Sequence, residues 1–190
     1  MTSSVSGLQL DLDLDDLPWV IGPTEQRPFK QWLPAAVLLM SQIFDVRQRK
    51  ERKYVTAMLE RIGRPDRGPL PYKLIRWLEL GEVPLVASFG MVERGTPELL
   101  EAFLAAADSG PVERPVIEDV PAPAGVIVRR SLSYSQPDAG LFVEARYVID
   151  NGHPAAVALL HAGERSPGAV VSALDDLDAL ALRMHVVGER

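Results

Sequence analysis

Leucine and polar residues alternate near the start of the chain, from Leu8 to Asp15. A period of two residues is typical of a strand with one buried face and one solvated face. The pattern therefore predicts an N-terminal strand over residues 8–15, with four leucines toward the core and the aspartates in water. The Asp-x-Asp-x-Asp spacing also suggests a calcium loop, but such a loop needs glycine at its sixth position, where this chain has Asp16.

A helical period follows the first strand. From Pro34 to Ile62, apolar residues recur three and four positions apart in two stripes, separated by a wholly polar segment from Arg47 to Lys53. Two helices that meet near residue 50 would fit this pattern. We favour one long helix over residues 34–62, because the two stripes are in phase. Pro34 suits the first turn of that helix.

Residues 84–187 show the pattern of strand, helix, four strands, helix and strand. Both helices are expected to start on a Ser/Thr-Pro pair after a β run, at Thr96-Pro97 and at Ser166-Pro167. Asn151-Gly152 between two β runs predicts a hairpin. Together with a strand over 72–78, this order predicts an α+β fold: a single antiparallel sheet of about six or seven strands, flanked by helices on both faces. We expect one domain over residues 1–190.

The order of elements in residues 84–187 resembles the PsbP-like fold, shared by the photosystem protein PsbP and a Ran-binding nuclear-import factor. The likeness rests on the closing elements: a β run over 155–162, the Ser166-Pro167 start, an amphipathic helix over 170–182 and a short strand over 184–187. This resemblance is one of topology and transfers no motif residue. It implies a twisted antiparallel sheet covered on both faces and a binding or adaptor role, because that fold is mostly non-enzymatic.

Composition and charge exclude several classes of function. The chain has no cysteine, which removes disulfides, thiolate metal sites and a cysteine nucleophile. Its formal charge of −6 argues against general nucleic-acid binding. Without a long apolar run or a signal peptide, we expect no membrane partner and a cytoplasmic location. Arginine greatly outnumbers lysine, which indicates a GC-rich bacterial genome. Glycine-rich phosphate loops do not occur, and we expect no cofactor.

Candidate catalytic residues are isolated in the sequence. Ser88 lacks the glycines of a nucleophile elbow and lies within a β run. His153 follows Asp150 at the predicted hairpin tip, where an Asp/His pair could act as a general base, but a solvated histidine is favoured there. His161 and His185 add no regular spacing for a metal. We therefore predict no catalytic and no metal site.

Charged residues on the predicted strands and helices need partners. Arg129 and Arg130 are neighbours on a strand and must point to opposite faces. The arginine that faces the core needs a carboxylate, for which the candidates are Asp119, Glu144 and Asp150. A structural ion pair is favoured, and binding of an anionic ligand is the alternative. The last helix is expected to direct three carboxylates to water: Asp175, Asp176 and Asp178.

The polar segment in the middle of the predicted long helix is strongly basic. Its five cations lie within seven residues: Arg47, Arg49, Lys50, Arg52 and Lys53. On a helix they would surround the axis, in a portion where the apolar stripe lapses. We predict that they form a partner-binding surface for an acidic protein or for the aspartates of a second copy. A solvated helix face is the simpler alternative.

The sequence thus favours a non-catalytic protein-interaction or accessory module of the bacterial cytoplasm. The kind of small acidic α+β protein that this chain resembles implies an association with a secretion or toxin–immunity system. The alternative is a small-ligand-binding protein or hydrolase with a cleft between the sheet and the helices. A deep pocket with convergent polar side chains would favour the alternative. A flat apolar patch would favour the interaction module.

Overall fold

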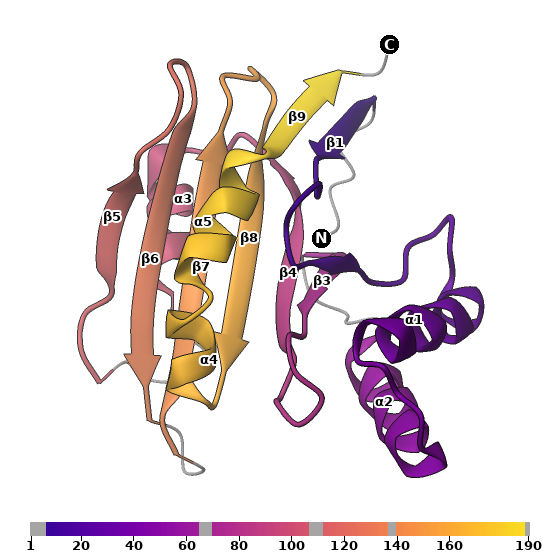
Figure 1. Ribbon diagram of the computed structural model, residues 1–190. Helices are drawn as coiled ribbons and strands as arrows, with labels where there is room; N and C mark the ends of the chain where they lie inside the picture. Colours follow the sequence, from indigo (N-terminus) through magenta and orange to yellow (C-terminus); the bar gives the residue numbers. More distant parts are fainter. Residues whose placement is uncertain (1–6, 65–69, 107–111, 137–139, 189–190) are drawn as a thin grey trace.

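A seven-stranded antiparallel sheet forms the centre of the molecule (Figure 1). The computed structural model describes residues 7–64, 70–106, 112–136 and 140–188. The strands lie in the order β2-β3-β4-β8-β7-β6-β5. Their bounds are Val20–Ile21 for β2, Tyr72–Arg76 for β3, Leu85–Glu93 for β4, Val116–Val120 for β5, Ile127–Ser135 for β6, Phe142–Asp150 for β7 and Ala156–Glu164 for β8.

Helices cover both faces of this sheet. On one face, α4 (Pro167–Val171) and α5 (Leu174–Leu182) bury their apolar residues in a cluster that includes Tyr147 of β7. On the other face, Leu104 of α3 (Pro97–Ala105) packs in a separate cluster with Val148. Tyr147 and Val148 are consecutive residues, so the alternation of the strand separates the two cores. The predicted α+β class, with an antiparallel sheet and helices on both faces, is confirmed.

The first and last strands pair with each other in a second, two-stranded sheet (Figure 1). β1 (Leu8–Leu12) is antiparallel to β9 (Met184–Gly188), with Leu12 opposite Met184. The four N-terminal leucines pack half-buried against the main core, and the alternating aspartates are exposed, as predicted. The strand ends at Leu12 and not at residue 15, because the chain turns there and Asp16 adopts a positive φ of 63°.

The prediction of one long helix over residues 34–62 is wrong. The segment forms α1 (Phe29–Ile43) and α2 (Arg49–Ile62). Asp45 takes a left-handed conformation, with φ of 47°, which ends the first helix. The second helix begins at Arg49, because the side chains of Gln48 and Glu51 each accept a hydrogen bond from the other residue's backbone N–H. Pro34 lies inside α1 and not in its first turn.

The C-terminal helix is also divided. α4 and α5 replace the predicted helix over 170–182 and are separated by Ser172 and Ala173. Thr96 and Ser166 occupy the predicted N-cap positions of α3 and α4, each followed by proline. Neither hydroxyl makes a capping hydrogen bond, so proline with its preset φ is the more important part of each pair.

Candidate interaction surface

Helices α1 and α2, with the turn over residues 44–48, form a helical arm beside the end of the sheet that contains β2 and β3 (Figure 1). Its inner side is a separate apolar core that contains Trp32, Val55, Leu59 and Trp77. The indole N–H of Trp32 donates to the carbonyl of Ile21 at 2.8 Å. The arm is therefore fixed to the sheet by its own packed core.

A lysine of the sheet holds the C-terminal end of the arm. Lys73 Nζ, on β3, donates to the carbonyl oxygens of Ile62 at 3.1 Å and of Arg64 at 2.7 Å. A cation at the carboxyl end of a helix satisfies free carbonyl groups and complements the helix dipole. Gly63 is needed at this end, because a Cβ there would lie 2.4 Å from the Trp32 ring.

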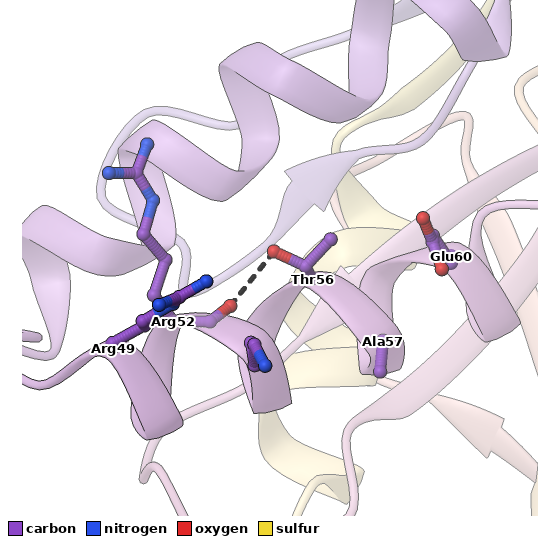
Figure 2. A pocket seen from close by; sticks show the side chains of 6 residues that line it. Arg49, Arg52, Thr56, Ala57 and Glu60 are labelled. Carbon is purple, nitrogen blue, oxygen red and sulfur yellow. Dashed lines mark hydrogen bonds between the residues drawn. The ribbon is translucent and has the colours of Figure 1, made fainter.

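The outer face of α2 carries the basic residues predicted from the sequence (Figure 2). Arg47, in the turn, pairs with Asp45 at 2.6 Å. The other four cations are exposed, and none of them makes a salt bridge within the part of the chain that the structure describes: Arg49, Lys50, Arg52 and Lys53. Several of the protein's other arginines are paired with carboxylates. The α2 face is thus a local excess of positive charge on an acidic protein.

The same face of α2 contains a shallow depression of about 350 Å³. Its lining comes from one helix alone: Arg49, Arg52, Lys53, Thr56, Ala57 and Glu60. The Thr56 hydroxyl donates a hydrogen bond to the backbone carbonyl of Arg52 at 2.8 Å (Figure 2). A depression formed by the side chains of a single helix offers contact area to a partner and encloses little of a small ligand.

Apolar side chains are uncovered on the outer side of α1. Leu38, Leu39 and Ile43 are 55%, 42% and 56% exposed. Between Lys30 and Asp45 the helix contains no charged residue. A helix that is apolar on all sides is usually buried on all sides, and in this structure only its inner side is covered. The arm therefore presents uncovered apolar side chains on α1 and unpaired cations on α2.

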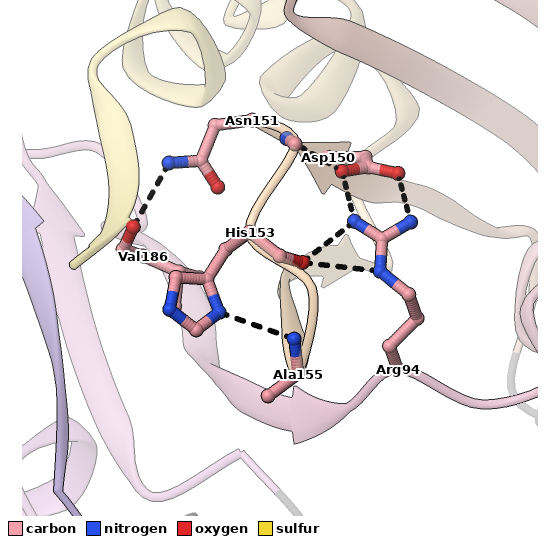
Figure 3. Close-up of polar contacts among 7 residues, drawn as sticks. Arg94, Asp150, Asn151, His153, Ala155 and Val186 are labelled. Carbon is pink, nitrogen blue, oxygen red and sulfur yellow. Dashed lines mark hydrogen bonds and ion pairs between the residues drawn. The ribbon is translucent and has the colours of Figure 1, made fainter. Parts of the chain in front are cut away.

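The Asp150/His153 pair predicted as a general-base candidate does not form. The guanidinium of Arg94, at the end of β4, donates to both carboxylate oxygens of Asp150, one of them at 2.7 Å (Figure 3). The same guanidinium donates to the carbonyl of His153, whose ring nitrogen Nδ1 accepts from the backbone N–H of Ala155 at 3.3 Å. The hairpin at Asn151-Gly152 is confirmed, with Gly152 at φ of 79°. These contacts bind the hairpin to the end of β4.

We expect the Arg94–Asp150 pair to contribute pH-dependent stability. Hydrogen bonding to Arg94 lowers the pKa of the Asp150 carboxyl below its usual range. A depressed folded-state pKa gives stability that is present above the unfolded-state pKa of about 3.9 and is lost as the pH falls through the folded-state value. Both side chains are partly exposed, so we expect about 1 kcal/mol at neutral pH.

The measurement is urea unfolding of wild type and Asp150→Asn between pH 3 and pH 7. The difference in the free energy of unfolding should be constant near neutral pH and shrink in acid. Most of this dependence should disappear in an Arg94→Met background, because the largest cause of the pKa shift is then gone. A difference that grows as the pH falls would contradict the assignment.

A buried polar network lies on the α3 side of the sheet. The Glu144 carboxylate is fully buried and accepts from Arg146 Nη2 and from His161 Nε2, each at 2.9 Å. Ser88 lies beside His161 on the neighbouring strand. The structure thus brings a serine, a histidine and a carboxylate together, but shows no hydrogen bond from the Ser88 hydroxyl among the described residues. The absence of a catalytic role for Ser88 and His161 stays a prediction.

Three serines of β6 lie in a row beside this network. Ser131, Ser133 and Ser135 are buried, and register places Ser131 opposite Arg146 and Ser133 opposite Glu144. Their hydroxyls have no hydrogen-bond partner within the described ranges. The sequence analysis missed this row, although the Ser-x-Ser-x-Ser spacing with period two places all three on one face of the strand.

The predicted partners of the two neighbouring arginines are mostly wrong. Arg130 binds Asp178 of α5 at 2.7 Å and Glu118 of β5 at 2.6 Å. Arg129, on the opposite face, pairs with Glu101 of α3 and lies 3.6 Å from Asp119, the one predicted partner it contacts. The other predicted partners, Glu144 and Asp150, bind Arg146 and Arg94 instead.

Two of the three aspartates predicted to face water also have partners. Asp176 binds Arg76 at 2.6 Å, and Asp178 binds both Arg130 and the Tyr147 hydroxyl. Of the three, Asp175 alone is exposed. The carboxylates of α5 therefore join this helix to the sheet, because the sheet presents arginines toward it.

His185, the remaining histidine, lies in β9 opposite Asp11. In the described parts of the chain, no group of three or more His, Cys, Asp or Glu residues is arranged to hold a metal ion. Within the same ranges, no helix is long and apolar enough to cross a membrane.

Comparison with known proteins identifies a similar fold and no family. No protein-family model matches the chain, and neither does any curated protein. Among solved structures, the chain is similar to LpqN of Mycobacterium tuberculosis, a protein described as involved in cell envelope biogenesis. The TM-score is 0.52 at 10% sequence identity, over 95% of this chain and 84% of LpqN. At this identity the likeness is one of fold alone.

Proposed function

We propose that this protein is a non-catalytic interaction module that binds a partner protein through the helical arm. The observation that carries the proposal is the combination of four unpaired cations on α2 with uncovered Leu38, Leu39 and Ile43 on α1. Most other arginines on the described strands and helices have a carboxylate partner. Cations without an internal partner are available to pair with an acidic one.

The partner that fits both features carries carboxylates and apolar side chains on one segment. A second copy of this chain fits less well. The exposed aspartates in and directly after its β1 would satisfy the cations, but the leucines of that segment face its own core. Two α1 helices packed together would cover the apolar side chains and leave the cations unpaired. We therefore favour a different, acidic protein as the partner.

The setting we propose is an accessory role beside a secretion or toxin–immunity system in the bacterial cytoplasm. A location at the cell envelope is the competing setting, because LpqN is described as involved in cell envelope biogenesis. Fractionation of host cells followed by detection of this protein would distinguish the two.

Charge reversal of the arm tests the proposal. We expect the variant with Arg49, Lys50, Arg52 and Lys53 changed to glutamate to keep its free energy of unfolding within about 1 kcal/mol. All four side chains are exposed, and negative charge in the first turns of α2 suits the helix dipole. Binding to the native partner, measured by affinity capture and then with the purified partner, should be lost. In wild type it should weaken with added salt.

The matched control reverses four exposed arginines outside the arm helices: Arg27, Arg64, Arg114 and Arg165. It makes the same change in net charge, and it should leave binding intact. Equal loss of binding in both variants would indicate a general charge effect and contradict the arm as the site. Tight, salt-sensitive binding of wild type to DNA in a gel-shift assay would favour a nucleic-acid protein. Dimers in sedimentation velocity that dissociate on reversal would favour a second copy as the partner.

A further inference from the structure

A second surface feature lies away from the outer face of α2. A cleft of about 350 Å³ separates the turn between β3 and β4 from α4, which we call the turn cleft. The volume lies near the lower end of small-molecule sites, about 300–1,000 Å³. Its lining combines one arginine, one glutamate, two serines and several apolar residues: Arg76, Leu78, Glu82, Val83, Leu85, Ser166, Gly168, Ala169 and Ser172.

Arg76 provides the guanidinium of the turn cleft, and Asp176 balances its charge. The Arg76 side chain is mostly buried, and its Nε donates to Asp176 of α5 at 2.6 Å. A guanidinium has five N–H donors, and among the described residues this is the one hydrogen bond that Arg76 makes from its side chain. Asp176 therefore fixes the orientation of the guanidinium from the Nε side, and the terminal amino groups remain available to a ligand.

The rest of the lining is apolar with a few polar groups. Leu85 is buried, while Leu78 and Val83 are about half exposed at the rim. The Ser166 hydroxyl does not cap α4, although it occupies the capping position. Glu82 is exposed and makes no salt bridge within the described parts of the chain. The turn cleft thus has an apolar side, a directed arginine and a separate carboxylate.

We propose that the turn cleft binds a carboxylate carried next to an apolar side chain. The two paired N–H groups at the end of a guanidinium match the two oxygens of a carboxylate, and an apolar side chain would cover Leu78, Val83 and Leu85. A peptide C-terminus and a free apolar amino acid share this chemistry. The free amino acid adds an ammonium group, for which Glu82 is the acceptor. This site is independent of the helical arm.

The test uses three probes: N-acetyl-leucyl-leucine, the same dipeptide with a C-terminal amide, and free leucine. Binding is followed by backbone amide shifts of the full-length protein at up to about 5 mM probe, where a weak site with Kd near 1 mM is well occupied. We expect the amides of Val83, Ala169 and Ser172 to shift with the acid. The dipeptide amide should bind at least about tenfold more weakly, because it lacks the charge that Arg76 recognises.

Two variants locate the site. Arg76→Gln should lose binding of the acid, whereas Arg165→Gln, which removes an exposed arginine beside Ser166, should bind as wild type does. Ala169→Leu fills the turn cleft and changes neither Arg76 nor Asp176, so it tests the proposal even if Arg76→Gln unfolds. The wild-type affinities distinguish the sources: free leucine should bind more tightly than the acetylated dipeptide if the ligand is an amino acid, and more weakly if it is a peptide C-terminus. Glu82→Gln should weaken only free leucine, because the acetylated dipeptide has no ammonium group.

The proposal is overturned if neither the acid nor leucine shifts these amides, if the dipeptide amide binds as well as the acid, or if Ala169→Leu binds as wild type does. None of these results bears on the helical arm, whose test depends on α2 and a protein partner. Conversely, loss of partner binding on charge reversal would leave the turn cleft intact.

Discussion

Glu144→Ala is expected to lower the free energy of unfolding by about 3–5 kcal/mol, the largest effect that we predict for a single substitution. The carboxylate is fully buried on β7 and accepts hydrogen bonds from Arg146 and His161. Its removal deprives Arg146, a residue that is 7% exposed, of this counter-charge. A buried charge that loses its partner costs far more than the pair contributes.

Urea unfolding measures this effect. Glu144→Gln keeps one acceptor oxygen and should cost less than Glu144→Ala. The control is Glu93→Ala, which removes an exposed glutamate from the end of β4 and should stay within about 0.5 kcal/mol. Equal effects of Glu144→Ala and Glu93→Ala would mean that Glu144 is not the centre of a buried network.

Asp178→Ala is expected to cost about 2–3 kcal/mol, the second largest effect. One oxygen of Asp178 accepts from the buried Tyr147 hydroxyl at 2.8 Å, and the other accepts from Arg130 at 2.7 Å. Burial raises the pKa of Tyr147, and the Asp178 carboxylate raises it further, so the hydroxyl stays protonated as a donor. The substitution leaves this donor unsatisfied and removes the polar contacts of α5 with β6 and β7.

Asp175→Ala is the matched control for Asp178→Ala, because it removes a neighbouring but exposed aspartate of the same helix. It should be nearly silent. A double-mutant cycle with Tyr147→Phe should show that the two losses are not additive, since a phenylalanine ring has no hydroxyl to satisfy. Additive losses would indicate that Tyr147 and Asp178 stabilise the fold independently.

For the candidate interaction surface, the sequence and the tertiary structure reveal different features. The charge cluster in the Arg47–Lys53 segment is visible in the sequence, because composition alone reveals it. The sequence did not reveal that Leu38, Leu39 and Ile43 are uncovered, because a helix that is apolar on all sides does not indicate which side is covered. The turn cleft was equally hidden, since Arg76 and Ser166 are far apart in sequence.

The sequence by itself determined the elements whose signals are local. Alternation predicted β1, and β runs between turn residues predicted the main strands. Ser/Thr-Pro pairs marked the starts of α3 and α4, and Asn151-Gly152 marked the hairpin between β7 and β8. These patterns act through backbone preferences of a few adjacent residues, so they can be recognised without the fold. The matching phase of the two apolar stripes led to the wrong prediction of one long helix over residues 34–62. In the structure, a left-handed Asp45 and the Gln48–Glu51 capping pair divide this segment into α1 and α2.

Only the tertiary structure decided which charges meet. Arg130 finds Asp178 across 48 residues of chain, and Arg76 finds Asp176 across 100. The pairing of arginines with carboxylates depends on the order of the strands and on which helix covers each face of the sheet. A short segment of the sequence determines neither. For the same reason β1 and β9 pair with each other from opposite ends of the chain. Electrostatic and edge-strand partners are set by assembly of the whole sheet, after local patterns have formed its parts.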